Sequence, residues 1–114
     1  MDVIVDVAAA IICFASTCHP VLVGKDTPRG EFQLTQYAIE SPGYGGDLLV
    51  FKRDKGDVFA IHRVLDLPGQ QRPARLHSPY PKHRIDVTGG CVNVAPEVYD
   101  KLVDCCSDSK VTIK

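Results

Sequence analysis

The chain has 114 residues, of which 45% are apolar and 24% charged, and its formal net charge is −1. That length suits one compact domain, since domains commonly hold about 100–150 residues, so we expect a single domain over residues 1–114. The near-neutral charge offers no attraction for nucleic acid or an anionic membrane. No apolar run approaches the ~18 residues of a membrane span. We therefore expect neither a nucleic-acid partner nor membrane insertion.

The first part of the chain is rich in short apolar and β-branched runs, which predict strands. These runs cover residues 3–7, 10–15 and 19–24. The run 7–15 also resembles the apolar part of a signal peptide. However, Asp2 and Asp6 precede it, no Lys or Arg does, and no small-residue cleavage site follows. We interpret it as a buried first strand and expect no classical signal peptide.

The middle of the chain predicts one strand, a loop and a hairpin. Polar and apolar residues alternate over 31–35, as in a half-buried strand. Residues 41–46 are too rich in glycine and proline for regular structure. Residues 48–52 and 58–64 then read as a hairpin. Residues 67–86 carry four prolines and no clear periodicity, so we expect a long loop that covers a binding cleft.

The end of the chain predicts one helix and a last strand. Pro96 stands where a first helical position is expected. The apolar side chains that follow recur at helical spacing and are Val98, Leu102 and Cys105 or Cys106. Residues 110–114 alternate as a strand. The residues alone therefore predict a mostly β fold with one or two helices.

Five cysteines, an odd number, leave at least one unpaired within a single chain. The four other than Cys91 lie at residues 13–18 and 105–106. They predict one or two disulfides between these two regions in an oxidising compartment, because adjacent cysteines are poorly placed to bond each other. The alternative is that they are small buried apolar residues. Residues 13–19 lack a second ligand pair at zinc-site spacing, so we expect no metal.

Two glycines directly before Cys91 make this stretch the most informative of the chain. Glycines let the backbone come close to whatever the sulfur touches and turn amides toward it. A thiol with such amides and a base nearby forms a thiolate nucleophile and its oxyanion hole. The sequence therefore predicts acyl transfer by Cys91, with the backbone amides around Gly89, Gly90 and Cys91 stabilising the oxyanion.

Candidate bases for Cys91 all precede it in the chain, which excludes papain-like hydrolases, where the histidine follows the cysteine. Caspase-like enzymes have the right order, but their cysteine signature is absent. We favour His62 as the base because it lies at the end of a predicted strand. His77 and His83 are nearer in sequence and stay open as alternatives.

Three elements in one order resemble the catalytic domain of L,D-transpeptidases (YkuD-like). Residues 27–32 match the family's Thr-Pro-x-Gly-x-Phe element, and His62 matches its strand histidine. Residues 88–93, Thr-Gly-Gly-Cys-Val-Asn, match its Ser/Thr-His-Gly-Cys-hydrophobic-Asn/Arg signature. The resemblance spans about residues 3–106. Two features depart from it: Gly89 replaces the signature's histidine, and 25 residues separate His62 from Thr88, more than is usual.

The resemblance implies a β-sandwich with the nucleophile between a strand and the C-terminal helix. It also implies that the carbonyl of Arg63 orients His62. Family substrates are peptidoglycan stem tetrapeptides, which form a thioester with the cysteine and lose the terminal D-residue. An amine acceptor then gives a cross-link or an exchanged D-amino acid, and water gives L,D-carboxypeptidase trimming. No cofactor is implied.

Substrate-binding residues follow from the same resemblance and from charge. Arginines pair with carboxylates in a bidentate manner. We therefore expect Arg63, Arg72 or Arg75 to hold the carboxylates of the stem. The full set of substrate-binding candidates is Thr88, Asn93, Arg72, Arg75 and Tyr80.

The setting implied is the periplasm or cell wall, of the producing or a target cell. The missing signal peptide suits an effector delivered by a secretion apparatus such as type VI, which would be paired with a cognate immunity protein. Two other hypotheses stay open. One is a peptidoglycan-binding module that kept the fold and lost catalysis, with Gly89 and the long insertion as its signs. The other is a general cysteine hydrolase.

Overall fold

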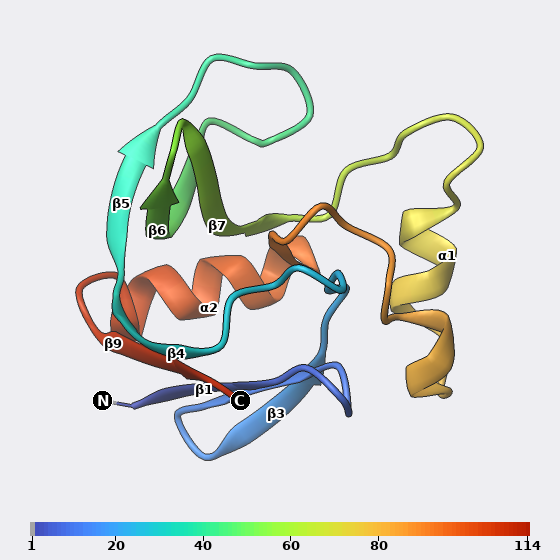
Figure 1. Ribbon diagram of the computed structural model, residues 1–114, viewed down its shortest axis with the longest axis horizontal. Helices are drawn as coiled ribbons and strands as arrows, with labels where there is room; N and C mark the ends of the chain where they lie inside the picture. The colour runs from blue at the N-terminus through green and yellow to red at the C-terminus, as the bar shows by residue number, and fades with distance from the viewer. Residues whose placement is uncertain (1) are drawn as a thin grey trace.

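The computed structural model describes residues 2–114, which form nine strands, two α-helices and one 3-10 helix (Figure 1). The strands are β1 (Val3–Asp6), β2 (Ile11–Phe14), β3 (Thr17–Pro20), β4 (Gly30–Gln33), β5 (Thr35–Ala38), β6 (Asp47–Asp54), β7 (Asp57–Arg63), β8 (Val92–Val94) and β9 (Lys110–Ile113). The helices are α1 (Arg72–Leu76), η1 (Pro81–His83) and α2 (Pro96–Cys106). The predicted mostly β fold with one or two helices is confirmed. No helix among the described residues has the length and apolarity that a membrane span needs.

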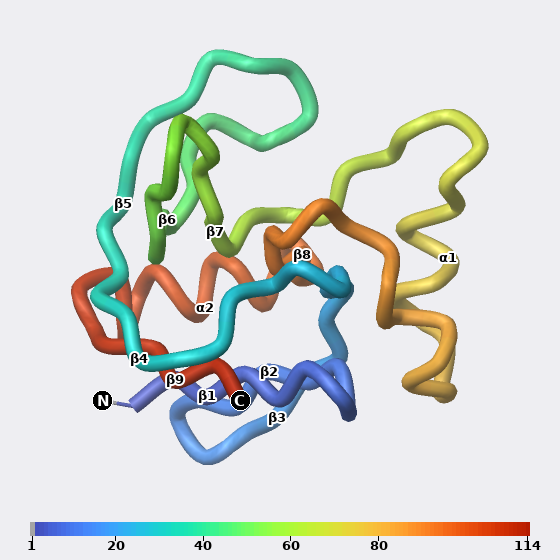
Figure 2. The backbone as a smooth tube through the Cα atoms, viewed as in Figure 1, coloured from blue at the N-terminus to red at the C-terminus, as the bar shows by residue number. Residues whose placement is uncertain are grey.

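The strands form two mixed sheets. Sheet A has the order β3-β2-β1-β9-β4, and sheet B has the order β5-β6-β7-β8. The pairs β1–β9 and β7–β8 are parallel, and the other neighbours are antiparallel. The chain leaves sheet A after β4, passes the buried Leu34 and enters sheet B as β5 (Figure 2). The strand predicted over residues 31–35 is thus divided between the two sheets.

The core lies between the sheets and includes one face of α2 (Figure 1). The buried side chains of α2 are Val98, Tyr99, Leu102 and Cys106. Relative to Val98 they lie at positions i, i+1, i+4 and i+8, which gives the helix one apolar side. Pro96 opens the helix, as predicted, because its fixed φ and missing N–H suit a first helical position. Burial of each large apolar side chain contributes roughly 1.5–3 kcal/mol.

We interpreted the apolar run at residues 7–15 as one buried strand, and this interpretation is wrong. Residues 7–10 form a turn between β1 and β2. The carboxylate of Asp6 accepts a hydrogen bond from the amide of Ala9 at 3.1 Å, and Ala10 has a left-handed φ of 52°. A side chain that bonds the backbone in this way favours a turn over a continued strand.

The segment 67–86 is not a structureless loop, since it contains α1 and η1. Helices this short leave no periodic pattern in a sequence. Arg84, only 5% exposed, holds the segment against the rest of the chain. Its guanidinium donates to the carbonyls of Ala9 at 3.1 Å and Ser78 at 2.6 Å. One of the basic residues of this segment is therefore a buried structural contact.

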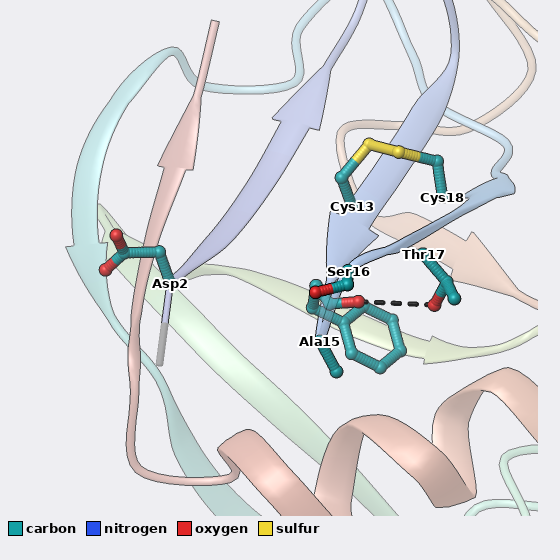
Figure 3. Close-up of a pocket in the computed structure, with 7 residues that line it drawn as sticks. Asp2, Cys13, Ala15, Ser16, Thr17 and Cys18 are labelled. Atoms are coloured by element: carbon teal, nitrogen blue, oxygen red, sulfur yellow. Dashed lines mark hydrogen bonds between the residues drawn. A yellow bond between two sulfur atoms is a disulfide. The ribbon is translucent and has the colours of Figure 1, made fainter.

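The disulfides predicted between residues 13–18 and 105–106 are wrong. Cys13 bonds Cys18 across the β2–β3 hairpin, where the two are directly paired and their Cα atoms lie 4.1 Å apart (Figure 3). Cys105 bonds its neighbour Cys106 at the end of α2, a pairing that we had considered unfavourable.

The direction of the side chains explains why the predicted connection does not form. Cys13 alternates with Ile12 and Phe14, whose side chains are buried in the core, so Cys13 points to the outer face of sheet A. Cys106 is buried on the inner side. The sheet therefore separates the two pairs. Cys91 is the one cysteine of residues 2–114 with a free thiol.

Candidate active site

The central residues of the candidate site share the outer face of sheet B. In the parallel pair β7–β8, His62 lies opposite Asn93 and Ile61 lies opposite Val92. Because successive side chains of a strand point to opposite faces, the two apolar residues enter the core. His62, Asn93 and Cys91 are on the other face. Cys91 directly precedes β8, which leads through one residue into α2.

Two hollows meet at Cys91 and share the side chains of Tyr44, Val58, His62 and Cys91. The first, of about 380 Å³, also has Asp57, Arg72 and Gly89 in its wall. The second, of about 360 Å³, is mainly apolar and is lined further by Ile39, Leu48 and Val50, among others. A hollow of about 480 Å³ at the β2–β3 turn has no histidine or free thiol in its wall (Figure 3). Among residues 2–114, the hollows that contain the free thiol are therefore the two at Cys91.

The thiol of Cys91 is half-buried and lies over β7. Its Sγ is 3.8 Å from the carbonyl oxygen of Val58. Burial raises the pKa of this thiol, and the amide of Ala60 and the charge of Arg72 only partly oppose the rise. The resting thiol is thus protonated near neutral pH, and it needs a base to become a nucleophile.

His62 is held at both ring nitrogens. Its Nδ1 is 2.7 Å from the carbonyl oxygen of Arg63, and its Nε2 is 3.3 Å from Nδ2 of the Asn93 side chain. The ring of Tyr44 packs edge-on at 4.8 Å between centroids. Burial lowers the pKa of His62 and the charge of Arg72 lowers it further, whereas the hydrogen bond to Arg63 opposes them. His62 is therefore neutral at pH 7, the form that accepts a proton.

The side chain of Arg63 does not face the hollows, because other groups hold it. It donates to the carboxylate of Asp47 at 2.8 Å, to Asp100 at 3.4 Å and to the carbonyl of Tyr44 at 3.0 Å. Its guanidinium also lies 4.2 Å from the ring centre of Tyr99. Burial alone would raise the pKa of Asp47, but hydrogen bonds from Arg63 and Tyr99 lower it. This clamp fixes the end of β7, and only the Arg63 carbonyl is directed to the candidate base.

A short hydrogen-bonded turn presents Cys91. The hydroxyl of Thr88 donates to the carbonyl of Cys91 at 2.6 Å and accepts from the amide of Gly90 at 3.1 Å. The amide of Gly90, one of the predicted oxyanion donors, therefore already has a partner. Gly89, another of them, lies in the wall of the polar hollow.

Gly90 requires the absence of a side chain, and this requirement gives a stability prediction. Its φ is +131°, and an added Cβ would lie 2.5 Å from an edge carbon of Phe59. We expect Gly90→Ala to lower the free energy of unfolding by about 1–3 kcal/mol. Gly89→Ala is the matched control, because a Cβ there meets no atom within 4 Å, and it should change stability by less than about 0.5 kcal/mol. Urea unfolding of both variants measures the difference, and equal losses would contradict the explanation.

Of the arginines predicted to bind substrate, Arg72 reaches the site. It lies at the start of α1, lines the polar hollow and donates to the Asn93 side-chain oxygen at 3.0 Å. Arg75 lines a different hollow, together with Ser78 and His83. Within residues 2–114, Arg72 forms no ion pair with a carboxylate.

The remaining candidates lie away from Cys91. Tyr80 is 58% exposed and packs against the ring of His83. His83 bonds the hydroxyl of Ser78 at 2.6 Å. His77 lines a hollow against β3. None of the three shares a hollow with Cys91.

Two contributors to the site geometry were missed in the sequence, namely Asp47 and Tyr99. Tyr99 could have been placed on the buried face of the helix, because it lies three residues before Leu102. Asp47 follows two glycines at the start of a strand and carries no local signal of its partner. No group of three or more metal-binding side chains occurs among residues 2–114.

Solved structures with the same fold are L,D-transpeptidases. The L,D-transpeptidase from Mycobacterium smegmatis has a TM-score of 0.62 at 15% sequence identity, over 99% of this chain and 58% of that one. The L,D-transpeptidase from Xylanimonas cellulosilytica has a TM-score of 0.63 at 17% identity, over 99% and 59%. LD transpeptidase LdtMt1 in complex with imipenem has a TM-score of 0.61 at 13% identity, over 99% and 58%.

These likenesses establish the fold, and the chain spans less than two thirds of the length of each neighbour. No family model and no curated protein matches the sequence.

Proposed function

We propose that this chain is a cysteine acyltransferase that acts on peptidoglycan stem tetrapeptides through a thioester on Cys91. The reaction would be L,D-transpeptidation, D-amino-acid exchange or L,D-carboxypeptidase trimming. The observation that carries the proposal is the shared hollow of Cys91 and His62, which pairs a free thiol with a neutral imidazole. Its setting, the fold of L,D-transpeptidases, indicates the substrate class.

The proposed mechanism starts with proton transfer from the Cys91 thiol to Nε2 of His62. The thiol first rotates from Val58 toward the imidazole, since catalytic hydrogen bonds often tighten only with substrate bound. The thiolate then attacks the carbonyl carbon of the L-centre, and amides of the turn, foremost Gly89, stabilise the oxyanion. Each such donor contributes on the order of 3–4 kcal/mol.

Collapse of the tetrahedral intermediate breaks the peptide C–N bond. The His62 imidazolium gives its proton to the departing amine, so the terminal D-residue leaves as a neutral amine and the thioester remains. An incoming amine or water then attacks the thioester carbonyl and returns the proton to the cysteine through the same imidazole.

The polar hollow suits the anionic part of the stem. Arg72 is its cation, and this guanidinium has no carboxylate partner within residues 2–114. A free guanidinium pairs well with a carboxylate. We therefore propose Arg72, with Asn93 bonded to it and Thr88 in the Cys91 turn, as the part of the site that meets the stem carboxylates.

Incubation with purified tetrapeptide muropeptides tests the proposal, with product masses as the readout. Loss of terminal D-alanine supports it, and an added D-amino acid that replaces the alanine identifies exchange. Unchanged muropeptides, together with a reactive Cys91 thiol, would instead support the general cysteine hydrolase.

A carbapenem should acylate Cys91, because its strained ring is an acyl donor that needs no leaving amine. One fold neighbour, LdtMt1, was solved in complex with imipenem. We expect one imipenem adduct per chain in the intact mass, absent in Cys91→Ala. Adducts that persist in this variant would show reaction elsewhere.

A catalytically impaired peptidoglycan-binding module is the second candidate function. The observation that favours it is the resting geometry, in which Nε2 of His62 faces Asn93 and the thiol faces Val58. Muropeptide binding without any turnover would support this alternative.

The proposed location follows from the proposed substrate and is the periplasm or cell wall. An effector delivered by a secretion apparatus, with a cognate immunity protein, is a narrower form of the same proposal. Toxicity of the chain when it is exported to the periplasm of a susceptible cell would support that form.

A further inference from the structure

A chain of hydrogen bonds runs from α1 to the candidate base. Nη1 of Arg72 donates to Oδ1 of Asn93 at 3.0 Å. The amide nitrogen Nδ2 of Asn93 lies 3.3 Å from Nε2 of His62, and Nδ1 of His62 lies 2.7 Å from the carbonyl oxygen of Arg63. The last three residues belong to the adjoining strands β7 and β8, whereas Arg72 comes from the long segment between them.

The donors in this series of hydrogen bonds determine which nitrogen of the His62 ring carries the proton. A guanidinium only donates, so Arg72 requires the oxygen of Asn93 on its side and directs the Asn93 NH₂ group to His62. Nε2 must then accept, and the proton of the neutral ring is on Nδ1, where the Arg63 carbonyl accepts it. A doubly protonated ring would place an N–H of His62 against the N–H of Asn93.

Burial strengthens the preference for this one protonated form of His62. Asn93 is 0% and His62 is 2% exposed, so water cannot easily replace a lost partner. The groups that face His62 are the Asn93 amide, the Tyr44 ring, the Arg63 carbonyl and, across the hollow, Cys91 and Arg72. Asp57 lies in the wall of the same hollow, but no carboxylate of residues 2–114 hydrogen-bonds His62.

Arg72 is itself held in place. Its Nε donates to the side chain of Gln70 at 2.7 Å, a neutral acceptor that leaves the charge unpaired. The segment that carries it is anchored by the buried Arg84. The guanidinium therefore presents both a directed donor and a full positive charge to the site.

We propose that Arg72 is a positioning residue that acts through Asn93 to hold His62 in the neutral form, with the proton on Nδ1 and the lone pair of Nε2 accepting from the Asn93 side-chain amide. This inference rests on the proposed role of His62 as general base. It assigns the segment 67–86 a part in the chemistry, since this segment supplies the residue that sets the state of the base.

Nitrogen NMR of His62 over a pH titration tests the inference, because it reports both the tautomer and the protonation midpoint without any substrate. The variants are Arg72→Met, which removes the donor and charge, and Arg72→Lys, which keeps both. Lys82→Met is the control, an exposed cation of the same segment. We expect Arg72→Met to move the His62 midpoint to higher pH and to mix the tautomers. Arg72→Lys and Lys82→Met should retain the Nδ1–H form.

Asn93→Asp supplies a second perturbation in the same direction, because a carboxylate facing Nε2 favours the imidazolium. The midpoint of His62 should then lie above that of the unaltered chain. Asn93 is buried, so if this variant fails to fold, Arg72→Met decides alone. A second readout is the alkylation rate of Cys91 at pH 7, which should fall about three- to tenfold in Arg72→Met, since an opposite charge nearby favours the thiolate.

An unchanged His62 titration and tautomer in Arg72→Met would overturn the inference. This failure is distinguishable from failure of the proposed function. A chain that releases no D-alanine but shows the expected NMR changes would contradict the function and keep the positioning role. A chain that turns over muropeptides while Arg72→Met titrates like the unaltered chain would do the reverse.

Discussion

Replacement of Cys91 by alanine is expected to abolish turnover of tetrapeptide muropeptides, and replacement by serine should do the same. The thioester cannot form without the sulfur, and a serine hydroxyl is a far weaker nucleophile at its free pKa than a thiol. The side chain is half-buried at the start of a strand and outside the main core, so the fold should persist. Product masses over time measure the loss, with circular dichroism as the folding control.

Substantial residual turnover in Cys91→Ala would contradict the assignment of the nucleophile. Loss of both turnover and folded structure would make the serine variant decisive, because it preserves the volume of the side chain more closely.

His62→Ala is expected to lower the rate of acylation by several orders of magnitude. The imidazole is the proton acceptor, and a positioned general base contributes typically about 10²–10⁴-fold. Its removal also leaves the thiol with a pKa that burial raises, and therefore with little thiolate at neutral pH. Single-turnover acylation by an imipenem-type substrate measures the rate.

The matched controls are His77→Ala and His83→Ala, which should lower acylation by less than about tenfold, because neither side chain shares a hollow with Cys91. If His83→Ala were the inactive variant and His62→Ala remained active, the choice of base would be wrong.

The parts of the fold that were predictable carry local signals. The β6–β7 hairpin, the helix that starts at Pro96 and the last strand each have their own pattern of alternation, turn residues or helical spacing. The crossing from sheet A to sheet B at Leu34 has no local signal. Polar and apolar residues alternate in the same way in a strand that changes sheets and in a strand that stays in one sheet. The disulfide partners depended on which face of sheet A each cysteine occupies, and this is a tertiary property.

The candidate site likewise contains residues that the sequence marked and residues that it did not. Two glycines beside Cys91 and the strand pattern around His62 marked these two residues in the sequence. Both side chains line one hollow. The partners that hold them come from distant segments. The contact between Arg63 and Asp47 spans a strand pair, and that between Arg72 and Asn93 joins a helical segment to a strand. Spacing along the chain gives no account of such contacts.

The most direct test of the central claim is to trap the acyl-enzyme. The chain is mixed with a tetrapeptide muropeptide, quenched in acid within seconds, digested and mapped by mass spectrometry. The proposed function predicts an adduct on the peptide that contains Cys91, with the mass of the muropeptide less its terminal D-residue. Release of D-alanine without such an adduct, or with the adduct on another residue, would contradict it.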